Sequence, residues 1–252
     1  SMNGLMECVL EKFGDDICHG DIFVANDPHS AGGTHLPDIN LATPVYLEGE
    51  LQGFVCNIAH HADVGGIIAG SNAIGSTEIY QEGLRIPFLK LYEAGKLNTA
   101  IWELITINVR VPDLVLGDLQ AQIVACEIGS REYKEMFENY GIETLNIYAQ
   151  ELQKYAESLA RSEIEEIPDG NYKFVDYIDG LGEKPDPIKL NVSLIVSGDQ
   201  VVIDWTGSSP QVKGGINSPL PFTKAAAYTA LRSIMSSDIP NCHGYTRPIK
   251  II

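Results

Sequence analysis

The sequence predicts an α+β protein with mixed β-sheets and long amphipathic helices, as a fragment of a larger chain. Strand-like runs gather at 20–65 and again at 172–205, while residues 118–164 between them have helical periodicity. Strands that cluster, instead of alternating one by one with helices, favour α+β over a doubly wound parallel sheet. The 252 residues, 44% of them hydrophobic, suit one large or two modest domains.

Residues 1–115 are predicted to form a region of strands and loops after a short N-terminal helix. The helix follows from apolar residues that share one face: Leu5, Met6, Val9, Leu10 and Phe13. Runs rich in β-branched and aromatic residues predict strands at 20–27, 39–47 and 52–61. EGEL at 48–51 predicts a hairpin turn between the last two runs. A glycine-rich loop at 65–76 and a helix at about 98–110 complete the region.

Residues 116–168 are predicted to be helical. One helix is expected from about 118 to 140. A second is expected from about 144 to 164, where apolar residues recur every three or four positions. The PDG tripeptide at 168–170 ends this segment, because proline and glycine terminate helices.

Residues 169–252 are predicted to form strands, a hairpin and a helix, and to continue beyond the chain end. Strands are expected at 172–178, 188–196 and 201–205, with SGDQ linking the last two as a hairpin. A helix is expected at 223–235. The terminal RPIKII is an apolar, strand-like run. No downstream partner follows it in the chain, which suggests missing sequence or a missing subunit.

The composition excludes some classes of partner. A formal net charge of -17 repels phosphate backbones, so we expect no nucleic-acid binding. No apolar run approaches the roughly 20 residues that span a bilayer, so we expect no membrane association. The five cysteines are scattered and odd in number, which indicates free thiols and a cytoplasmic location.

Histidines and aspartates gather in two glycine-rich stretches, GGTHLPDIN at 32–40 and AHHADVGG at 59–66. Imidazole nitrogen and carboxylate oxygen together suit Zn²⁺, Mn²⁺ or Fe²⁺. Pro37 fixes a bend that can turn His35 and Asp38 toward one point. On a strand, the adjacent His60 and His61 would face opposite sides, so that only one joins a given ion. Alternatively, these residues only cap turns.

A second set of polar residues lies in TEIYQEGLRIP at 77–87. Glu78, Glu82 and Arg85 have helical spacings of four and three. They could be a carboxylate pair near the ion, with Arg85 gripping an anionic substrate. The alternative is an ion-pair network on the surface of a short helix. The chain has no phosphate-binding GxxxxGK[ST] motif, so nucleotide chemistry is expected elsewhere.

Several longer blocks together resemble the hydantoinase B/5-oxoprolinase family. They are GDIFVANDPHSAGGTHLPDINLATPVY, AHHADVGG, STEIYQEGLRIPFLKLY, GDLQAQIVAC, DWTGSSPQVKGGINSP and IPNCHGYTRPI, which appear in this order across nearly the whole chain. The family includes subunits of ATP-dependent hydantoinases, 5-oxoprolinases and caprolactamases, and of acetone and acetophenone carboxylases. One departure is Asn241-Cys242-His243-Gly244, where family members often have an asparagine–aspartate–glycine turn.

The resemblance implies a division of labour between two subunits. A hydantoinase A-type partner would bind ATP with Mg²⁺ and phosphorylate the substrate. This chain would complete the reaction with a divalent metal, Zn²⁺ or Mn²⁺. The family's metal ligands match His35, Asp38 and His60, with a further carboxylate ligand implied upstream of residue 1. His61 or Asp63 would be the base or would orient the ligands, and Glu78 would be a further catalytic residue.

The resulting hypothesis is a cyclic-amide hydrolase that opens hydantoin, 5-oxoproline or lactam rings and is inactive without its partner subunit. Phosphorylating the carbonyl oxygen makes it a good leaving group, and a metal site can activate water near neutral pH. Two alternatives stay open. One is a subunit of an ATP-dependent ketone carboxylase. The other is a non-catalytic assembly fragment.

Overall fold

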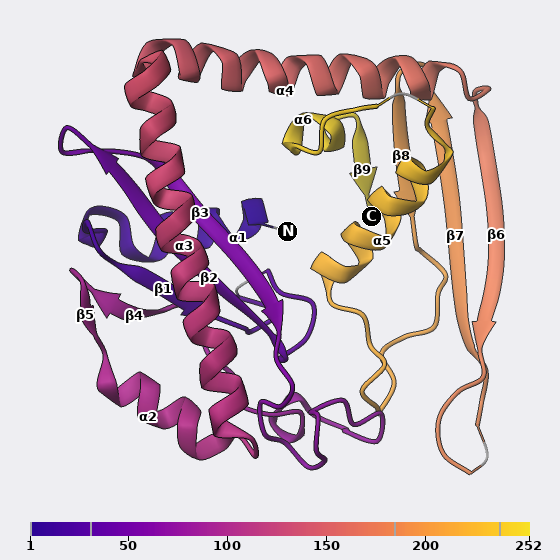
Figure 1. Ribbon diagram of the computed structural model, residues 1–252. Coiled ribbons are helices and arrows are strands. Elements are labelled where there is room, and N and C mark those ends of the chain that lie inside the picture. The colour runs from indigo at the N-terminus through magenta and orange to yellow at the C-terminus, as the bar shows by residue number, and fades with distance from the viewer. Residues whose placement is uncertain (1, 31, 184, 237) are drawn as a thin grey trace. The chain divides into compact units, whose positions relative to one another are not determined.

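The protein, described here from a computed structural model, folds into two compact units. The structure describes residues 2–30, 32–183, 185–236 and 238–252. Unit 1 comprises Ser1–Asn139 and Lys213–Phe222, and unit 2 comprises Tyr140–Val212 and Thr223–Ile252. Each unit contains one sheet (Figure 1). Among the described helices, none has the length and apolar character needed to cross a membrane.

Unit 1 contains an antiparallel sheet of order β3-β2-β1-β4-β5. Its strands are β1 (Ile22–Ala25), β2 (Asp38–Leu47), β3 (Glu50–His60), β4 (Leu89–Glu93) and β5 (Lys96–Leu97). The hairpin predicted at EGEL is confirmed, because Leu47 pairs with Glu50. Glu48 and Gly49, between them, both have positive φ, as tight hairpin turns require.

Helices cover both faces of this sheet, which explains the alternation of apolar residues along β1. Ile22 and Val24 point into one core, together with apolar residues of α2 (Thr99–Asn108) and α3 (Pro112–Tyr140). Phe23 and Ala25 point into the opposite core, under α1 (Met2–Phe13). In Figure 1, α3 crosses one face of the sheet. Leu5, predicted on the apolar face of α1, lies outside the described side chains.

Two sequence predictions in unit 1 need correction. Helix α3 begins at Pro112, earlier than predicted, and proline suits the first helical position because its missing N–H has no partner to lose there. The helix indicated by the charge spacing at 77–87 does not form, and this segment contains only a short 3-10 helix, η2 (Ile79–Gln81). Gly83 then turns the chain at φ 143, a conformation that an α-helix cannot contain.

Unit 2 contains a sheet of order β6-β7-β8-β9. Its strands are β6 (Gly170–Ile178), β7 (Ile188–Ser197), β8 (Gln200–Asp204) and β9 (Ile249–Ile251). Its helices are α4 (Ile142–Glu165), α6 (His243–Thr246) and most of α5 (Leu220–Ile234). Buried residues of all three helices form one core with Val196, Val201 and Ile203 of the sheet. The predicted hairpin between β7 and β8 is confirmed by the pairing of Ser197 with Gln200.

The terminal run, for which only a downstream partner was considered, pairs with an upstream strand. Strand β9 pairs in parallel with β8, and Ile249 lies opposite Val201. A parallel pair needs a long crossover, and the chain between β8 and β9 supplies it through α5 and α6. The sequence pattern identified the strand but not its partner, because a parallel partner is remote along the chain.

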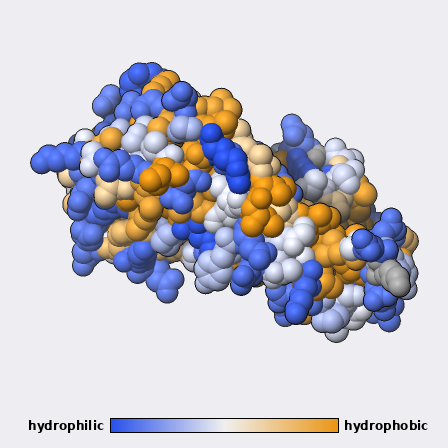
Figure 2. All heavy atoms as spheres, turned by 90° about the horizontal axis from the view of Figure 1, so that it is seen from below, coloured by the Kyte–Doolittle hydropathy of each residue, from blue (hydrophilic) through white to orange (hydrophobic). Residues whose placement is uncertain are grey.

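The surface carries apolar residues as well as many charges. Ile67, Ile68 and Ile74 of the glycine-rich loop are exposed, as are Phe174 and Tyr177 of β6. In Figure 2, hydrophobic patches interrupt the hydrophilic surface. All five cysteines are free thiols, as predicted.

Candidate metal centre and the neighbouring pocket

The β2–β3 hairpin brings Asp38 and His60 together. Asp38 is the first residue of β2 and His60 is the last residue of β3. Because the strands are antiparallel, these two residues lie directly opposite one another, at the separation that lets side chains interact across a sheet. Strand register therefore explains how two histidine–aspartate stretches that are separate in sequence meet at one point.

The turn before β2 adds His35 to this pair. Pro37 lies in the turn, and the Asp38 backbone N–H donates to the His35 carbonyl oxygen at 3.1 Å. The His61 N–H donates to the Pro37 carbonyl oxygen at 2.8 Å, and Leu36 is fully buried. The turn is thus fixed to the end of β3 and to the core.

The three side chains fit a divalent cation. One ligand atom from each of His35, Asp38 and His60 lies within 4.8 Å of the other two. His35 Nε2 is 3.3 Å from Asp38 Oδ1, and the two imidazole centroids are 4.9 Å apart. Ligands around tetrahedral Zn²⁺ lie about 3.4 Å apart, so a small inward movement would suffice. Two imidazoles and a carboxylate form a donor set that also leaves a coordination position open.

Hydrogen bonds orient these side chains and shift their pKa values. The bond to Asp38 is the main reason that the pKa of His35 is raised. Burial alone would raise the pKa of Asp38, but bonds from His35 and Thr34 lower it overall. His35 Nδ1 lies 3.2 Å from Asn72 Oδ1, so Nδ1 is the donor and Nε2 faces Asp38. A cation would displace a proton here, which makes its affinity pH-dependent.

His61 lies on the opposite side of β3 from His60, as the alternation of a strand predicts. His60 is exposed, whereas His61 is fully buried. His61 Nε2 lies 2.8 Å from Oε1 of Gln122 on α3. Burial lowers the pKa of His61, so the ring is neutral near pH 7. The structure therefore does not bring His61 into the group of His35, Asp38 and His60.

Asp63 is also engaged elsewhere. Its Oδ1 accepts from the backbone N–H groups of Gly65, at 2.9 Å, and Arg110, at 3.0 Å. Its Oδ2 accepts from the Gly70 N–H at 3.0 Å and from Arg110 Nη1 at 2.9 Å. The Arg110 guanidinium also donates to three carbonyl oxygens of the loop, those of Gly65, Gly66 and Ile68. Both oxygens of Asp63 are thus used to hold the glycine-rich loop.

The two glutamates of the 77–87 segment lie in different surroundings. Glu78 is exposed, immediately before η2. Glu82 is half-buried, and burial raises its pKa against the opposing effect of His35 and His29. The sequence analysis singled out Glu78, but Glu82 is the carboxyl group whose pKa responds to His35 and His29.

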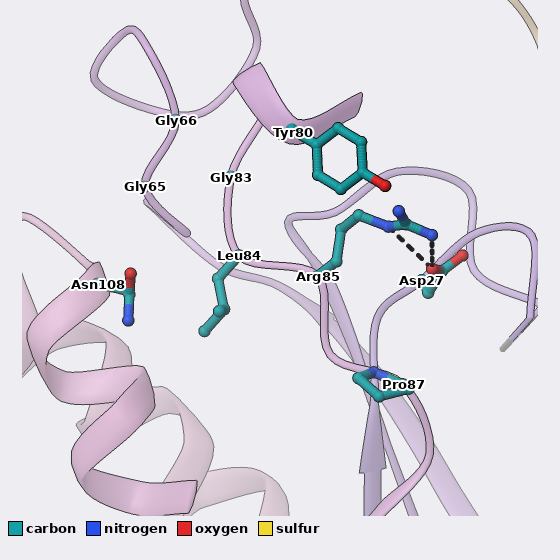
Figure 3. A pocket seen from close by; sticks show the side chains of 9 residues that line it. All are labelled: Asp27, Gly65, Gly66, Tyr80, Gly83, Leu84, Arg85, Pro87 and Asn108. Carbon is teal, nitrogen blue, oxygen red and sulfur yellow. Dashed lines mark hydrogen bonds and ion pairs between the residues drawn. The ribbon is translucent and has the colours of Figure 1, made fainter. Parts of the chain in front are cut away.

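Arg85 lines a pocket of about 550 Å³ within unit 1. Its Nε and Nη2 donate to Asp27 Oδ2 at 3.0 and 2.5 Å, and its guanidinium lies 5.3 Å from the centre of the Tyr80 ring. Figure 3 shows Tyr80, Arg85 and Asp27 together along one wall, with Gly65, Gly66 and Gly83 on the backbone beside them. A Cβ at Gly66 would lie 2.6 Å from the Glu82 carbonyl oxygen, so only glycine permits this close approach.

Sequence reasoning missed several polar partners. Asp27 pairs with Arg85, the exposed Arg110 pairs with Asp63, and the buried Gln122 contacts His61. Gln122 had a detectable signal: it lies on the same face of the predicted helix as Leu119, Ile123 and Cys126. A glutamine among apolar residues on a buried face requires polar partners.

Comparisons with known proteins agree on one family. A family model described as Hydantoinase B/oxoprolinase matches residues 1–252. A protein from Pseudomonas sp. (strain NS671), named as the B-type component of a D-/L-hydantoinase, is 37% identical over all of this chain, which covers 44% of that protein. The crystal structure of an ATP-dependent caprolactamase from Pseudomonas jessenii matches with a TM-score of 0.94 and 29% identity, over 100% of this chain and 43% of that one.

A more distant relative has another name. The acetophenone carboxylase delta subunit of Aromatoleum aromaticum (strain DSM 19018 / LMG 30748 / EbN1) is 28% identical over 85% of this chain and 31% of its own length. The chain therefore spans less than half the length of these relatives.

Proposed function

The chain belongs to the hydantoinase B/oxoprolinase family, and from that premise we propose that it is the metal-dependent subunit of an ATP-driven cyclic-amide hydrolase. The observation that carries the proposal is the convergence of ligand atoms from His35, Asp38 and His60 within 4.8 Å. Relatives named for hydantoinase and caprolactamase activity support the cyclic-amide substrate. Hydantoin, 5-oxoproline and other lactam rings are the candidates.

Three residues would hold the cation. Asp38 supplies the negative charge, and the imidazoles of His35 and His60 supply neutral nitrogen donors, with Asn72 fixing the His35 ring. When bound there, a divalent cation such as Zn²⁺ or Mn²⁺ would polarise the substrate oxygen and lower the pKa of water. His61 supports these ligands from the buried side of β3 and does not act as a base.

The pocket of Arg85 is the proposed substrate site. Arg85 has charge and hydrogen-bond donors, but Asp27 already neutralises it across two short bonds. A cyclic amide, with or without the carboxylate of 5-oxoproline, can present its polar edge to this wall and its face to the Tyr80 ring. Glu82, whose pKa burial raises, is the proton carrier that we propose for this site. The exposed Glu78 stays a weaker candidate.

ATP chemistry belongs to a partner in this proposal. Amide resonance protects a lactam carbonyl from water, and phosphorylating its oxygen creates a leaving group. The chain has no GxxxxGK[ST] motif for binding a nucleotide phosphate. Relatives named as subunits support a hetero-oligomer with a hydantoinase A-type subunit that binds ATP and Mg²⁺.

The test combines metal analysis with substrate-dependent ATP hydrolysis by the full-length protein and its partner. We expect about one equivalent of Zn²⁺ or Mn²⁺, and ring opening of 5-oxoproline or hydantoin coupled to ATP hydrolysis. The test variant is His60→Ala, which should lose both the bound metal and the ring-opening activity. Absence of bound metal, with unchanged melting on adding Zn²⁺ or Mn²⁺, would instead support a non-catalytic assembly role.

The second candidate function is ketone carboxylation, which the acetophenone carboxylase relative favours. It would use the same metal residues with a phosphorylated enol and an activated bicarbonate. ATP hydrolysis that responds to acetone or acetophenone plus bicarbonate, but not to cyclic amides, would select this alternative.

A further inference from the structure

A buried polar network lies directly beneath the candidate metal centre. Gln122, on α3, has a side chain bonded to three groups: His61, Asn57 of β3 and the Ile39 carbonyl oxygen of β2. Asn57 Nδ2 returns a bond to the Gln122 backbone carbonyl oxygen at 2.8 Å. The network therefore joins the two ligand-bearing strands to the helix that covers them.

The hydrogen bonds fix the direction of every group in the network. Gln122 Nε2 uses its two hydrogens on Ile39 O, at 2.9 Å, and Asn57 Oδ1, at 2.8 Å. Its Oε1 must then accept from His61 Nε2. The His61 Nδ1 consequently carries a lone pair, and among the described residues it has no hydrogen-bond partner.

Each end of the network adjoins a proposed ligand. Ile39 follows Asp38, and His61 follows His60. The His61 N–H also donates to Pro37 O at 2.8 Å, which holds the turn that presents His35. A movement of Gln122 would therefore be transmitted to both sides of the paired residues Asp38 and His60.

Stability alone explains this network poorly. Gln122 lies among apolar residues of α3, where a hydrophobic side chain would pack without polar partners. A buried nitrogen without a partner is a further cost, because nothing replaces the hydrogen bond that it makes to water in the unfolded chain. Such a cost is expected where a site needs fixed geometry more than maximal stability.

We propose that Gln122 and His61 are positioning residues that hold Asp38 and His60 at the spacing that binds a divalent cation. The inference rests on the proposed function, because it requires that the cluster binds a metal. It assigns the buried face of the hairpin a role that neither the ligand residues nor the substrate pocket supplies.

The test measures cation affinity and stability separately. Zn²⁺ and Mn²⁺ are titrated into the chelator-stripped, full-length protein by competition with a chromogenic chelator, and melting is followed without metal. We expect Gln122→Met, which keeps the volume and removes the hydrogen bonds, to weaken cation binding by roughly tenfold to a hundredfold. The matched control is Leu119→Ala, a cavity variant on the same buried face, which should lower the melting temperature while leaving affinity within about twofold.

A second variant covers the case that Gln122→Met does not fold. His61→Leu removes the nitrogen without a partner, and we expect affinity to fall at least tenfold with little change in melting. Equal affinity losses in Leu119→Ala and Gln122→Met would overturn the inference, because general loosening would then explain both. Unchanged affinity in Gln122→Met and His61→Leu would overturn it as well. A wild-type protein that binds no cation would refute the proposed function instead.

Discussion

Asp38 and Asp63 lie in similar sequence surroundings, yet the structure gives them opposite tasks. Each follows a histidine within three residues and neighbours glycine-rich sequence. Asp63 accepts four hydrogen bonds, two from Arg110 and two from loop N–H groups. Asp38 is paired with a histidine and a threonine, and a second histidine lies opposite it.

The difference teaches that the partners of a carboxylate decide its role, more than its neighbours in sequence do. An arginine and backbone amides use up the lone pairs of Asp63 permanently, because these donors stay protonated at all ordinary pH values. The imidazole partners of Asp38 can give up a proton to a cation, so that site can exchange ligands. We therefore expect mutations at the two aspartates to separate binding from stability.

The largest expected effect is on cation binding at Asp38. In Asp38→Asn, a neutral amide replaces the only carboxylate of the cluster, and Zn²⁺ affinity should fall by about a hundredfold or more. Asp63→Asn should change that affinity less than threefold. Competition titration with a chelator checks both values, and comparable losses in the two variants would erase the proposed distinction.

The second effect is on stability at Asp63. Asp63→Ala leaves the loop N–H groups and Arg110 without their shared acceptor, so the free energy of unfolding should fall by about 2–4 kcal/mol. We place the estimate below that of a fully buried pair because the Arg110 side chain is 41% exposed. Urea unfolding measures the loss. Asp38→Ala is the control and should lower the free energy of unfolding by about 1 kcal/mol or less. A larger loss of stability in Asp38→Ala than in Asp63→Ala would contradict the comparison.

The third effect is a pH dependence that Asp63 carries. Burial by itself would raise the pKa of Asp63, but hydrogen bonds from Arg110, Gly65 and Gly70 lower it overall. A lowered folded pKa adds stability above the unfolded value of about 4, and this stability is lost as the pH falls through the folded pKa. Wild type should therefore lose more stability than Asp63→Asn between about pH 5 and pH 2. Parallel pH profiles in urea unfolding would show that Asp63 does not titrate as described.

The sequence predicted that His35 and Asp38 turn toward one point, and the resemblance added His60; the structure brings these three side chains together. Pro37 marked the bend and EGEL marked the hairpin, but a register shift between Val45 and Tyr46 is also needed to place Asp38 opposite His60. The same reasoning gave Asp63 a role as the base or as an orienting residue, because its partner Arg110 is 47 residues away. Partners at such distances come from tertiary packing, which no local pattern records.

The same limit explains the errors in the fold. Antiparallel hairpins and amphipathic helices were predicted from the periodicity of apolar residues and from turn residues, since these signals depend on residues close together in the sequence. Residues 77–87 have helical charge spacing, but tertiary contacts determine their path. Asn26 Oδ1 accepts the Ile86 N–H at 2.6 Å, and Asn26 Nδ2 donates to the Leu84 carbonyl oxygen at 2.9 Å. A buried asparagine 58 residues away thus holds Glu82 and Arg85 out of a helix.

The smallest expected effect extends the comparison to the two arginines. Arg110→Lys removes a guanidinium that holds one carboxylate and three carbonyl oxygens. It should cost about 2 kcal/mol, since an ammonium cannot reproduce that fork of donors. Arg85→Lys keeps a charge beside Asp27 and should cost only about 1 kcal/mol or less, because both bonds from Arg85 to Asp27 reach the same carboxylate oxygen.

The two arginine variants should also separate substrate binding from stability. If Arg85 orients the substrate, Arg85→Lys should raise KM for the cyclic amide by up to about tenfold with kcat nearly unchanged, because uniform binding is what is lost. Arg110→Lys, measured well below its melting temperature, should leave KM unchanged. An equal rise in KM in both variants would mean that the pocket responds to the loop as a whole, and Arg85 would then have no separate contact with substrate.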